Sequence, residues 1–206
     1  MMAKHLGIVM AAALLVAAAG TARADEEAKP FGGQAPYASF GGVFGIENNS
    51  SSLGSGVSDY GGLSDSGGYD IRVGYNLRDW VAIEGEWQSL LSFSTDGVDP
   101  FTLNNLPAVE ARMLSFNGRF MPLSGRVQPY GLLGMGWYNV QADRVANNLH
   151  ESAFAMRFAV GVLAYITERT GVAIEAAYIL PVTGTLGGGD RFDLIPITAS
   201  VFFRFK

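Results

Sequence analysis

One short stretch of the chain carries residue types that could perform hydrolysis. His150 and Ser152 stand two positions apart, with Glu151 between them. A serine becomes a nucleophile when a base lies within hydrogen-bond reach and a third group orients that base. On a strand, residues i and i+2 share a face, so Glu151 would point away from both. No other carboxylate is a clear partner, and a solvated loop histidine is the simpler interpretation.

Two carboxylates in the stretch VAIEGEW form a second candidate. Glu84 and Glu86 share a face if this stretch is a strand, and they would then perturb one another's ionisation, as acid–base pairs in enzymes do. Arginines occur in the neighbouring segments. A salt-bridged filling of a narrow interior therefore explains these acids more simply than catalysis does.

Metal and nucleotide chemistry have little support in the sequence. The chain has no cysteine and two histidines, of which His5 lies in the N-terminal leader described below, so a multi-histidine or thiolate metal site is excluded. The glycine-rich stretches GLLGMG and GTLGGGD do not open a helix after a strand, as a nucleotide site requires. We expect no cofactor and no bound metal.

The first 24 residues are typical of a cleaved secretory signal peptide. Lys4 precedes an apolar run from Leu6 to about Gly20, and Ala22-Arg23-Ala24 is a small-x-small cleavage site. The run is too short to span a bilayer as a helix, so a membrane anchor is the weaker interpretation. Cleavage would remove two of the 14 basic residues and leave a formal charge of −7, which argues against nucleic-acid binding.

Apolar and polar side chains alternate in later segments of the chain. A period of two predicts strands, and tilted strands of about 9–11 residues cross a bilayer. In one segment Phe158 and Val160 lie on one face, with Arg157 and Leu163 on the other. Residues 35–47 and 127–142 are apolar on both faces, so their faces stay unassigned. The eight predicted strands are 35–47, 67–77, 80–93, 109–121, 127–142, 153–166, 171–183 and 192–205.

The connections between these strands alternate in length, which favours one topology. Short connections lie near residues 76–79, 122–126 and 167–170, whereas those near 47–66, 94–107, 143–151 and 184–191 are longer. Up-and-down barrels of outer membranes have short periplasmic turns and long extracellular loops. The sequence therefore predicts an all-β fold, an eight-stranded antiparallel up-and-down transmembrane β-barrel over residues 35–206, after a short periplasmic segment at 25–34.

Aromatic residues collect near both ends of the predicted strands, as rings do at membrane–water interfaces. The set near the short turns is Tyr75, Trp80, Phe120, Tyr130, Tyr165, Phe203 and Phe205. A looser set near the long loops is Trp87, Phe93, Phe154, Tyr178 and Phe192.

The leader, the eight segments, VQPYGLLGMG and the terminal VFFRF resemble the small outer-membrane barrels of the OmpA-like and OmpX-like superfamily. This resemblance implies export by the Sec route, an outer-membrane location with both termini periplasmic, and contact with outer-membrane lipids and lipopolysaccharide. It also implies that the barrel-assembly machinery reads the C-terminal aromatics Phe203 and Phe205, although Lys206 follows them here. It implies no common activity.

We expect a non-enzymatic protein with an envelope-structural role or a surface-contact role through its long loops, where a surface ligand could bind. One alternative is a lipid A-modifying hydrolase, because the His150–Ser152 pair on a barrel resembles the outer-membrane lipid A deacylases. Another is a small-solute or hydrophobic-ligand conduit. An eight-stranded barrel is just wide enough for side chains to fill, which disfavours an open pore.

Charged residues on the polar face must lie in the lumen if this fold is correct. Residues that pair across the tight turn at 76–79 must point to the same face, which places Arg72 opposite Glu84 or Glu86. Asp70 lies on the same face, two residues further from the turn. Arg119, Arg157, Glu175 and Arg204 complete the expected charge network. The opposite face should contact lipid: Ile71, Val73, Ile83, Phe158, Val160, Val162, Ile174, Val201 and Phe203. A soluble barrel would bury these residues instead.

Overall fold

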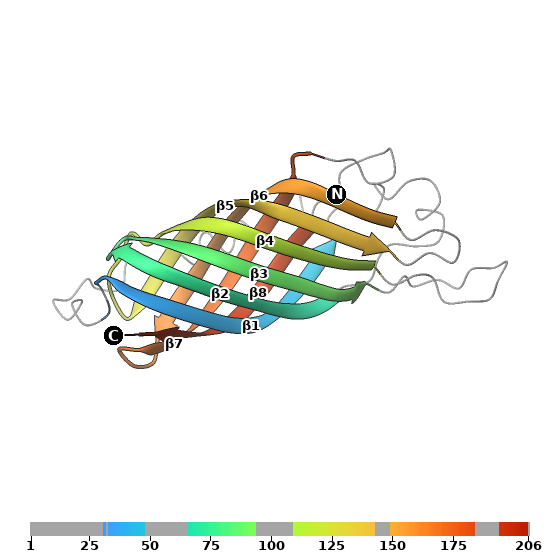
Figure 1. Ribbon diagram of the computed structural model, residues 1–206. Helices are drawn as coiled ribbons and strands as arrows, with labels where there is room; N and C mark the ends of the chain where they lie inside the picture. The colour runs from blue at the N-terminus through green and yellow to red at the C-terminus, as the bar shows by residue number, and fades with distance from the viewer. Residues whose placement is uncertain are drawn as a thin grey trace, which may run out of the picture.

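The computed structural model describes residue 31 and residues 33–47, 66–93, 109–142, 149–183 and 194–205. These residues form eight strands around one axis (Figure 1). They are β1 (Ala35–Glu47), β2 (Ser66–Arg78), β3 (Val81–Phe93), β4 (Val109–Phe120), β5 (Val127–Ala142), β6 (Leu149–Tyr165), β7 (Thr170–Pro181) and β8 (Leu194–Arg204). The eight predicted strands are confirmed, and the largest shift is at β6, which begins four residues before the predicted 153. The predicted signal peptide at 1–24 lies outside the described residues.

Each strand pairs antiparallel with its neighbours in sequence, and β8 pairs with β1 to close the barrel. Following the register once around from Tyr37 leads back to β1 at Glu47, ten residues further along. This stagger tilts the strands steeply against the barrel axis, as Figure 1 shows. Eight strands at this tilt leave an interior that side chains can fill.

The two ends of the barrel differ in the length of their connections. At one end, which we call the short-turn end, consecutive strands are joined by residues 79–80, 121–126 and 166–169. β1 begins and β8 ends at this same end. At the long-connection end, residues 48–65, 94–108, 143–148 and 184–193 join the strands and lie outside the described residues. No helix among the described residues is long and apolar enough to cross a membrane.

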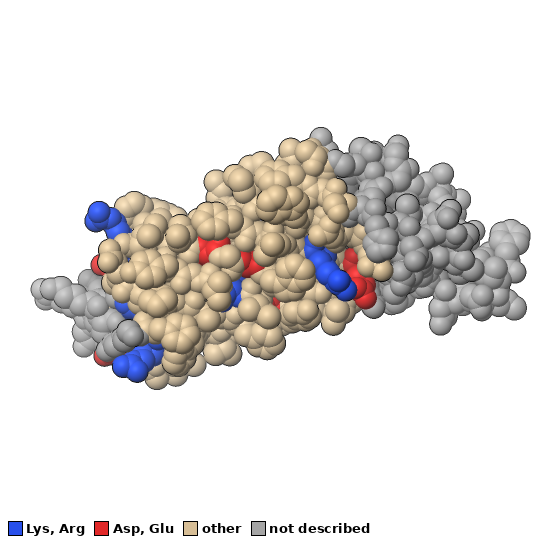
Figure 2. All heavy atoms as spheres, viewed as in Figure 1, with Lys and Arg blue, Asp and Glu red and all other residues tan. Residues whose placement is uncertain are grey.

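The outer wall of the barrel is apolar, as the alternation predicts. Val73, Ile174 and Val201 are 61%, 64% and 62% exposed, and all nine side chains predicted to face lipid lie on the outer face. Val160 and Val162 are half-buried, because outward neighbours such as Ile174 flank them. Uncharged residues cover most of the wall in Figure 2. No second sheet covers this face within the described part of the chain.

The structure assigns the faces of the two strands that the sequence left open. In β1, Tyr37 faces the lumen and Phe40 faces outward. In β5, Tyr130 and Tyr138 are buried in the lumen, whereas Trp137 is exposed. Both faces of these strands are apolar, so pairing with the neighbouring strands, and not polarity, decides which face is inside.

Aromatic rings lie on the outer wall near both ends. Trp80 and Phe120 meet edge to face with ring centroids 5.8 Å apart at the short-turn end, and Trp137 and Phe154 do so at 6.3 Å near the other end. Two residues of the predicted short-turn set belong elsewhere: Tyr130 and Tyr165 have inward parity and are buried in the lumen. The side chain of Phe93 and all of Phe192 lie outside the described set.

Gly41 allows β1 to approach β8 closely. A Cβ atom at this position would lie 2.2 Å from the carbonyl oxygen of Ala199 and 2.6 Å from Ser200 Cα, and these backbone atoms cannot move aside without shifting the strand. At the adjacent Gly42 the nearest atom is 4.0 Å away. The contact between β1 and β8 therefore requires glycine at position 41, whereas position 42 has room for a side chain.

Replacing Gly41 with alanine is expected to lower the free energy of unfolding by about 1–3 kcal/mol, the usual cost of forcing extra volume into a packed region. Gly42→Ala is the matched control, because its Cβ enters open space, and it should leave stability near the wild-type value. Urea unfolding of the folded barrel in detergent micelles measures both variants. Equal destabilisation by the two substitutions would contradict the close approach at Gly41.

Candidate functional site

Aromatic and apolar side chains close the lumen at the short-turn end. The ring of Phe202 lies 4.9 Å from that of Tyr37 and 5.6 Å from that of Tyr165, measured between centroids. Phe31, from the segment before β1, packs on Tyr165 at 5.2 Å. We call this group the aromatic layer; its other members are Ala82, Met121, Tyr130, Leu163 and Ala173.

The residues before β1 are fixed to the rim of this layer. Arg204 Nη2 donates a hydrogen bond to the Gly33 carbonyl oxygen at 3.0 Å, and the Gly33 N–H donates to the carboxylate of Asp79. Gln34 Nε2 donates to the Leu77 carbonyl oxygen at 3.1 Å. Arg204, which we expected in the charge network, therefore faces the lumen but lies two residues beyond Phe202, on the rim side of the aromatic layer.

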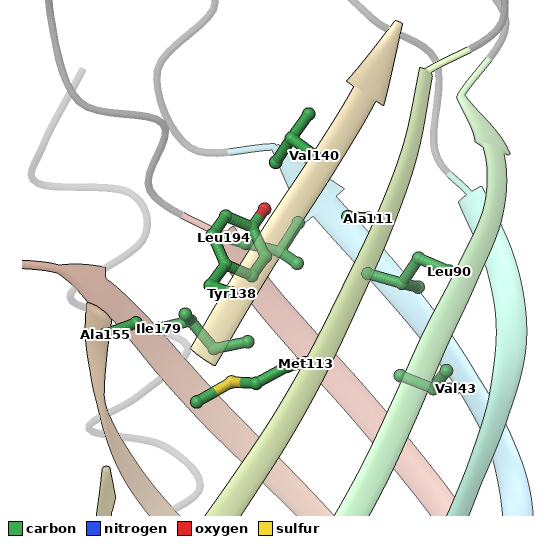
Figure 3. Packing of buried hydrophobic residues seen from close by; sticks show 9 residues of the cluster. All are labelled: Val43, Leu90, Ala111, Met113, Tyr138, Val140, Ala155, Ile179 and Leu194. Carbon is green, nitrogen blue, oxygen red and sulfur yellow. The ribbon is translucent and has the colours of Figure 1, made fainter. Parts of the chain in front are cut away.

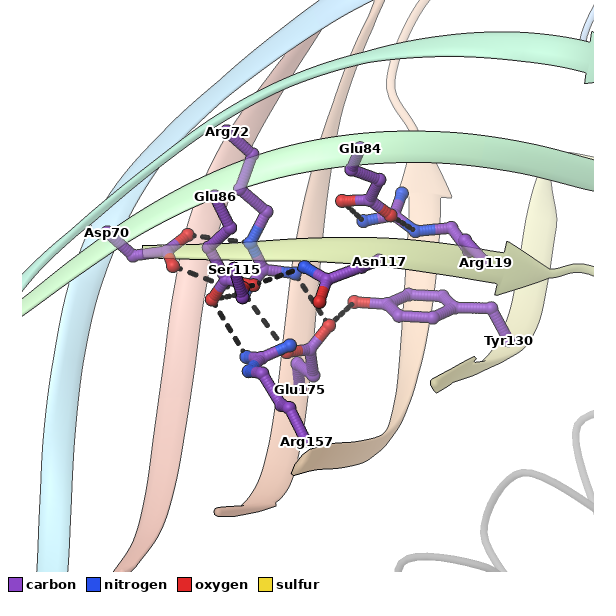
Figure 4. Close-up of polar contacts among 10 residues, drawn as sticks. All are labelled: Asp70, Arg72, Glu84, Glu86, Ser115, Asn117, Arg119, Tyr130, Arg157 and Glu175. Carbon is purple, nitrogen blue, oxygen red and sulfur yellow. Dashed lines mark hydrogen bonds and ion pairs between the residues drawn. The ribbon is translucent and has the colours of Figure 1, made fainter. Parts of the chain in front are cut away.

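Ionisable side chains fill the middle of the lumen (Figure 4). We call them the charge layer: Asp70, Arg72, Glu84, Glu86, Arg119, Arg157 and Glu175, which are at most 3% exposed. β2, β3, β4, β6 and β7 each contribute at least one of these residues. Period-two alternation brings every one of them to the inner face.

Arg72 forms ion pairs with three carboxyl groups of the charge layer. It lies directly opposite Glu86 in the β2–β3 register, one of the two partners that the sequence predicts, and their closest N···O distance is 3.4 Å. Its shorter contacts are with Asp70, at 2.8 Å from Nε, and with Glu175, at 2.7 Å from Nη1. Glu175 lies on β7, so Arg72 links strands that are not neighbours in the sheet.

Glu175 and Glu86 are held by several donors. Glu175 accepts from Arg72, from Arg157 Nη2 at 2.6 Å and from the Tyr130 hydroxyl at 2.9 Å. Glu86 contacts Arg157 Nη2 at 2.9 Å and accepts from Asn117 Nδ2 at 2.7 Å. Ser115 Oγ also donates to Glu86, at 3.3 Å. These contacts fix both carboxylates at the centre of the lumen.

Glu84 and Arg119 form a separate ion pair in the same layer. Arg119 Nη2 donates to Glu84 Oε2 at 3.1 Å, and Arg119 Nε lies 2.5 Å from Glu84 Oε1. The guanidinium carbon lies 4.3 Å from the centroid of the Tyr130 ring and 5.5 Å from that of Tyr37. Arg119 thus connects the charge layer to the aromatic layer.

A third group of side chains fills the lumen towards the long-connection end (Figure 3). We call it the apolar layer: Val43, Leu90, Ala111, Met113, Tyr138, Val140, Ala155, Ile179 and Leu194, all buried. Seen along the axis, the described lumen thus passes from aromatic to ionisable to apolar side chains. Each layer is packed, so the interior is a filled core.

Comparison with known proteins identifies this architecture. Residues 9–205 match the family described as outer membrane protein beta-barrel domain. The chain belongs to this family. Membership places the protein in the bacterial outer membrane. No curated protein matches the sequence of this outer-membrane barrel.

Solved structures of small outer-membrane barrels share its fold. Neisserial surface protein A is 11% identical with a TM-score of 0.64, over 84% of this chain and 99% of that one. Ail, the attachment invasion locus protein of Yersinia pestis, is 13% identical with a TM-score of 0.55, over 84% and 99%. OprG from Pseudomonas aeruginosa is 14% identical with a TM-score of 0.55, over 83% and 96%. At these identities the likeness concerns the fold alone.

Ser152 of the hydrolase candidate lies on the outer wall of the barrel near the long-connection end. Ser152 is exposed and pairs with Asn139 of β5, and its hydroxyl donates to Asn139 Oδ1 at 2.5 Å. His150 pairs with Gln141 along the backbone, and the side chains of His150 and Glu151 lie outside the described set. The hydroxyl proton of Ser152 is thus directed to an amide oxygen, which does not activate a serine.

Sequence reasoning overlooked several residues that complete the charge layer. Ser115, Asn117 and the hydroxyl of Tyr130 all donate to its carboxylates. A repeat in the sequence could have indicated Tyr130: Pro-Tyr occurs at 36–37 and 129–130, and Val-Ala-Ile-Glu at 81–84 and 172–175. The repeated glutamates are Glu84 and Glu175, so each half of the outer-membrane barrel contributes a tyrosine and an acid to the lumen.

The repeated tyrosines also pack in the same way. Tyr37 lies opposite Gly74, and Tyr130 lies opposite Gly161. A Cβ atom on Gly74 would lie 2.4 Å from the Tyr37 ring, and one on Gly161 would lie 2.5 Å from the Tyr130 ring. Each ring therefore lies close against a glycine of the next strand, and the Tyr130 hydroxyl reaches past Gly161 to Glu175, which pairs with this glycine in the β6–β7 register.

Proposed function

We propose that this outer-membrane barrel is a non-enzymatic envelope protein that makes contacts at the cell surface through its long connections. The observation that carries the proposal is the filled lumen. The charge layer is linked across the barrel by ion pairs such as Arg72–Glu175, and packed apolar side chains lie on either side of it. A lumen of this kind supports the wall and offers no aqueous path. We therefore assign the function to the connections at the long-connection end.

The proposed orientation places the short-turn end and both termini in the periplasm after export by the Sec route. Barrels of this kind have short periplasmic turns and long extracellular loops. Polar residues on the outer wall near the long-connection end support a headgroup boundary there. Arg112 and Glu110 form an exposed ion pair at 2.8 Å, and Ser152 and Asn139 are also exposed. Lipopolysaccharide would surround this boundary, and Phe203 and Phe205 would serve barrel assembly.

The charge of the long connections indicates what kind of ligand they would bind. Residues 48–65, 94–108, 143–148 and 184–193 contain seven acidic and two basic residues. Such a surface attracts cationic partners and repels polyanions. Ail of Yersinia pestis has been crystallised with the heparin analogue sucrose octasulfate, a polyanion. The present barrel would favour the opposite ligand class, a basic peptide or a basic protein surface.

A labelled oligolysine peptide is expected to bind the barrel in nanodiscs of zwitterionic lipid, and to bind several-fold more weakly when Asp59, Asp65, Asp96 and Asp99 are all replaced by asparagine. Each substitution removes one negative charge from the long connections, and added salt should weaken wild-type binding. Fluorescence anisotropy of the peptide measures both effects. Sucrose octasulfate should not bind.

Surface display is the control for this experiment. The chain has no cysteine, so Ser55→Cys and Ser124→Cys each introduce one thiol, at opposite ends of the barrel. In intact cells a membrane-impermeant maleimide should label the first and not the second. The proposal fails if the labelling is reversed, if the four-asparagine variant binds as tightly as wild type, or if the wild-type barrel gives stable conductance steps in planar bilayers.

A further inference from the structure

The charge layer holds one carboxyl group more than its guanidinium groups balance. Glu84 and Arg119 form their own ion pair. The remaining carboxyls are Asp70, Glu86 and Glu175, and the remaining guanidiniums are those of Arg72 and Arg157. All five of these residues are at most 2% exposed. Arg204 does not change the balance, because the aromatic layer lies between it and these groups.

An unbalanced charge at this depth is costly. A buried ion without a partner costs several kcal/mol in effective desolvation, and such a group usually becomes neutral instead. The layer must therefore take up one positive charge, as a proton or as a metal cation. Among the described residues no group of three or more acidic, histidine or cysteine side chains is arranged to hold a metal ion. The geometry favours the proton.

The donors around each carboxyl group indicate where the proton lies. Glu175 accepts from two arginines and a tyrosine, and Glu86 contacts two arginines and accepts from Asn117 and Ser115. Asp70 has the fewest donors, since its hydrogen bonds come from Arg72 alone, at 2.8 Å and 3.4 Å. Arg72 is in turn shared with Glu175 and Glu86. The ionised form of Asp70 is thus the least stabilised of the three.

Gln88 gives an independent indication at the same place. It lies directly opposite Asp70 in the β2–β3 register and is 2% exposed. Neither its Oε1 nor its Nε2 has a hydrogen-bond partner among the described residues. Side chains directly opposite on one face have Cβ atoms about 4.5–5.5 Å apart. A neutral Asp70 could therefore donate its carboxyl O–H to Gln88 Oε1 and accept from Nε2, whereas a carboxylate could accept from Nε2 but would leave Oε1 without a donor.

We propose that Asp70 is a proton-binding site that is occupied at neutral pH. Three neighbours then determine whether Asp70 keeps its proton. The positive charge of Arg72 opposes protonation. The negative charge of Glu86 favours it, and Gln88 favours it by accepting the hydrogen bond of the carboxyl O–H. Arg157 and Glu175 lie on the facing strands β6 and β7 and largely balance each other. Loss of the proton at alkaline pH would leave an excess negative charge in the lumen. This inference does not depend on the proposed surface role.

Two measurements on the full barrel in detergent micelles test the site. The infrared spectrum of wild type at pH 7 should show the C=O stretch of a protonated carboxyl group, and Asp70→Asn should lack it. Unfolding equilibria should show the linked proton. In the unfolded chain Asp70 loses its proton near pH 4. In the folded barrel it loses the proton only at a higher pH. Between these two pH values the folded wild type therefore binds one proton more than the unfolded chain. Its unfolding equilibrium constant relative to that of Asp70→Asn should therefore rise about tenfold per pH unit.

Glu175→Gln is the matched control, because it neutralises a carboxylate that the inference treats as ionised. At pH 7 it should lower the urea midpoint, whereas Asp70→Asn should keep the midpoint at or above the wild-type value. Absence of the infrared band, or no rise in the relative constant with pH, overturns the site. So does a midpoint that falls when sodium is replaced by tetramethylammonium at constant ionic strength, which would indicate a metal cation. If Asp70→Asn does not fold, the band in wild type and its loss on raising the pH decide the question.

Discussion

Arg72→Ala is expected to lower the free energy of unfolding by about 3–5 kcal/mol, the usual cost of removing one partner from a buried ion pair. The substitution removes the guanidinium that contacts Asp70 and leaves Arg157 as the guanidinium in contact with Glu86 and Glu175. It also removes a direct link between β2 and β7 across the lumen. Urea unfolding followed by heat-modifiable gel migration measures the change.

Two controls separate the buried charge from the loss of a large side chain. Arg169→Ala removes an exposed arginine in the turn between β6 and β7, and should change stability by about 0.5 kcal/mol or less. Combining Arg72→Met with Glu175→Leu removes both members of a pair and should be less harmful than Arg72→Ala, because Arg157 then has one carboxylate fewer to balance. Equal effects of Arg72→Ala and Arg169→Ala would show that the charge layer does not support the barrel.

Val160→Arg should impair assembly of the barrel in the outer membrane. Val160 lies on the outer face of β6, between Gly131 of β5 and Ala176 of β7. A basic residue on the lipid face at the bilayer midplane costs about 2–4 kcal/mol, and the cost falls to about 0–1 kcal/mol near the interfaces. The amount of heat-modifiable, folded protein in the outer-membrane fraction measures the effect, which should be a clear loss.

The same strand provides a matched control on the same face. Ser152 is eight residues from Val160, so it also points outward, but it lies near the long-connection end among polar neighbours such as Asn139. Ser152→Arg should therefore assemble close to the wild-type level. Tolerance of arginine at both positions would contradict a lipid-facing wall, and intolerance at both would indicate that β6 is sensitive to any large substitution.

The filled lumen also limits how this barrel can act. Its ion pairs join strands that are far apart around the wall, as Arg72 and Glu175 do. Such links stiffen the wall and keep the ends of the strands at fixed positions. The connections at the long-connection end are then presented by a rigid scaffold, which is the usual arrangement for binding loops.

The sequence by itself determined the strands and most of their faces. Alternation with period two is local, so β2, β3 and β6 could be assigned from polarity alone, and the lumen charges followed from it. The position of Arg72 opposite either Glu84 or Glu86 could also be predicted, because a tight turn limits which residues of adjacent strands can pair, and the structure has Glu86 there. β1 and β5 could not be assigned, because both of their faces are apolar.

Only the tertiary structure decided which charges meet across the lumen. Arg72 and Glu175 are 103 positions apart, and their contact depends on the ten-residue stagger that accumulates around the closed barrel. No local pattern contains that stagger, since it is a property of all eight strand pairs together. For the same reason parity alone did not show that Arg204 lies beyond the aromatic layer or that Tyr130 donates to Glu175. The alternation along a strand determines whether a side chain points inward. Closure of the barrel determines at which position along the barrel axis it does so.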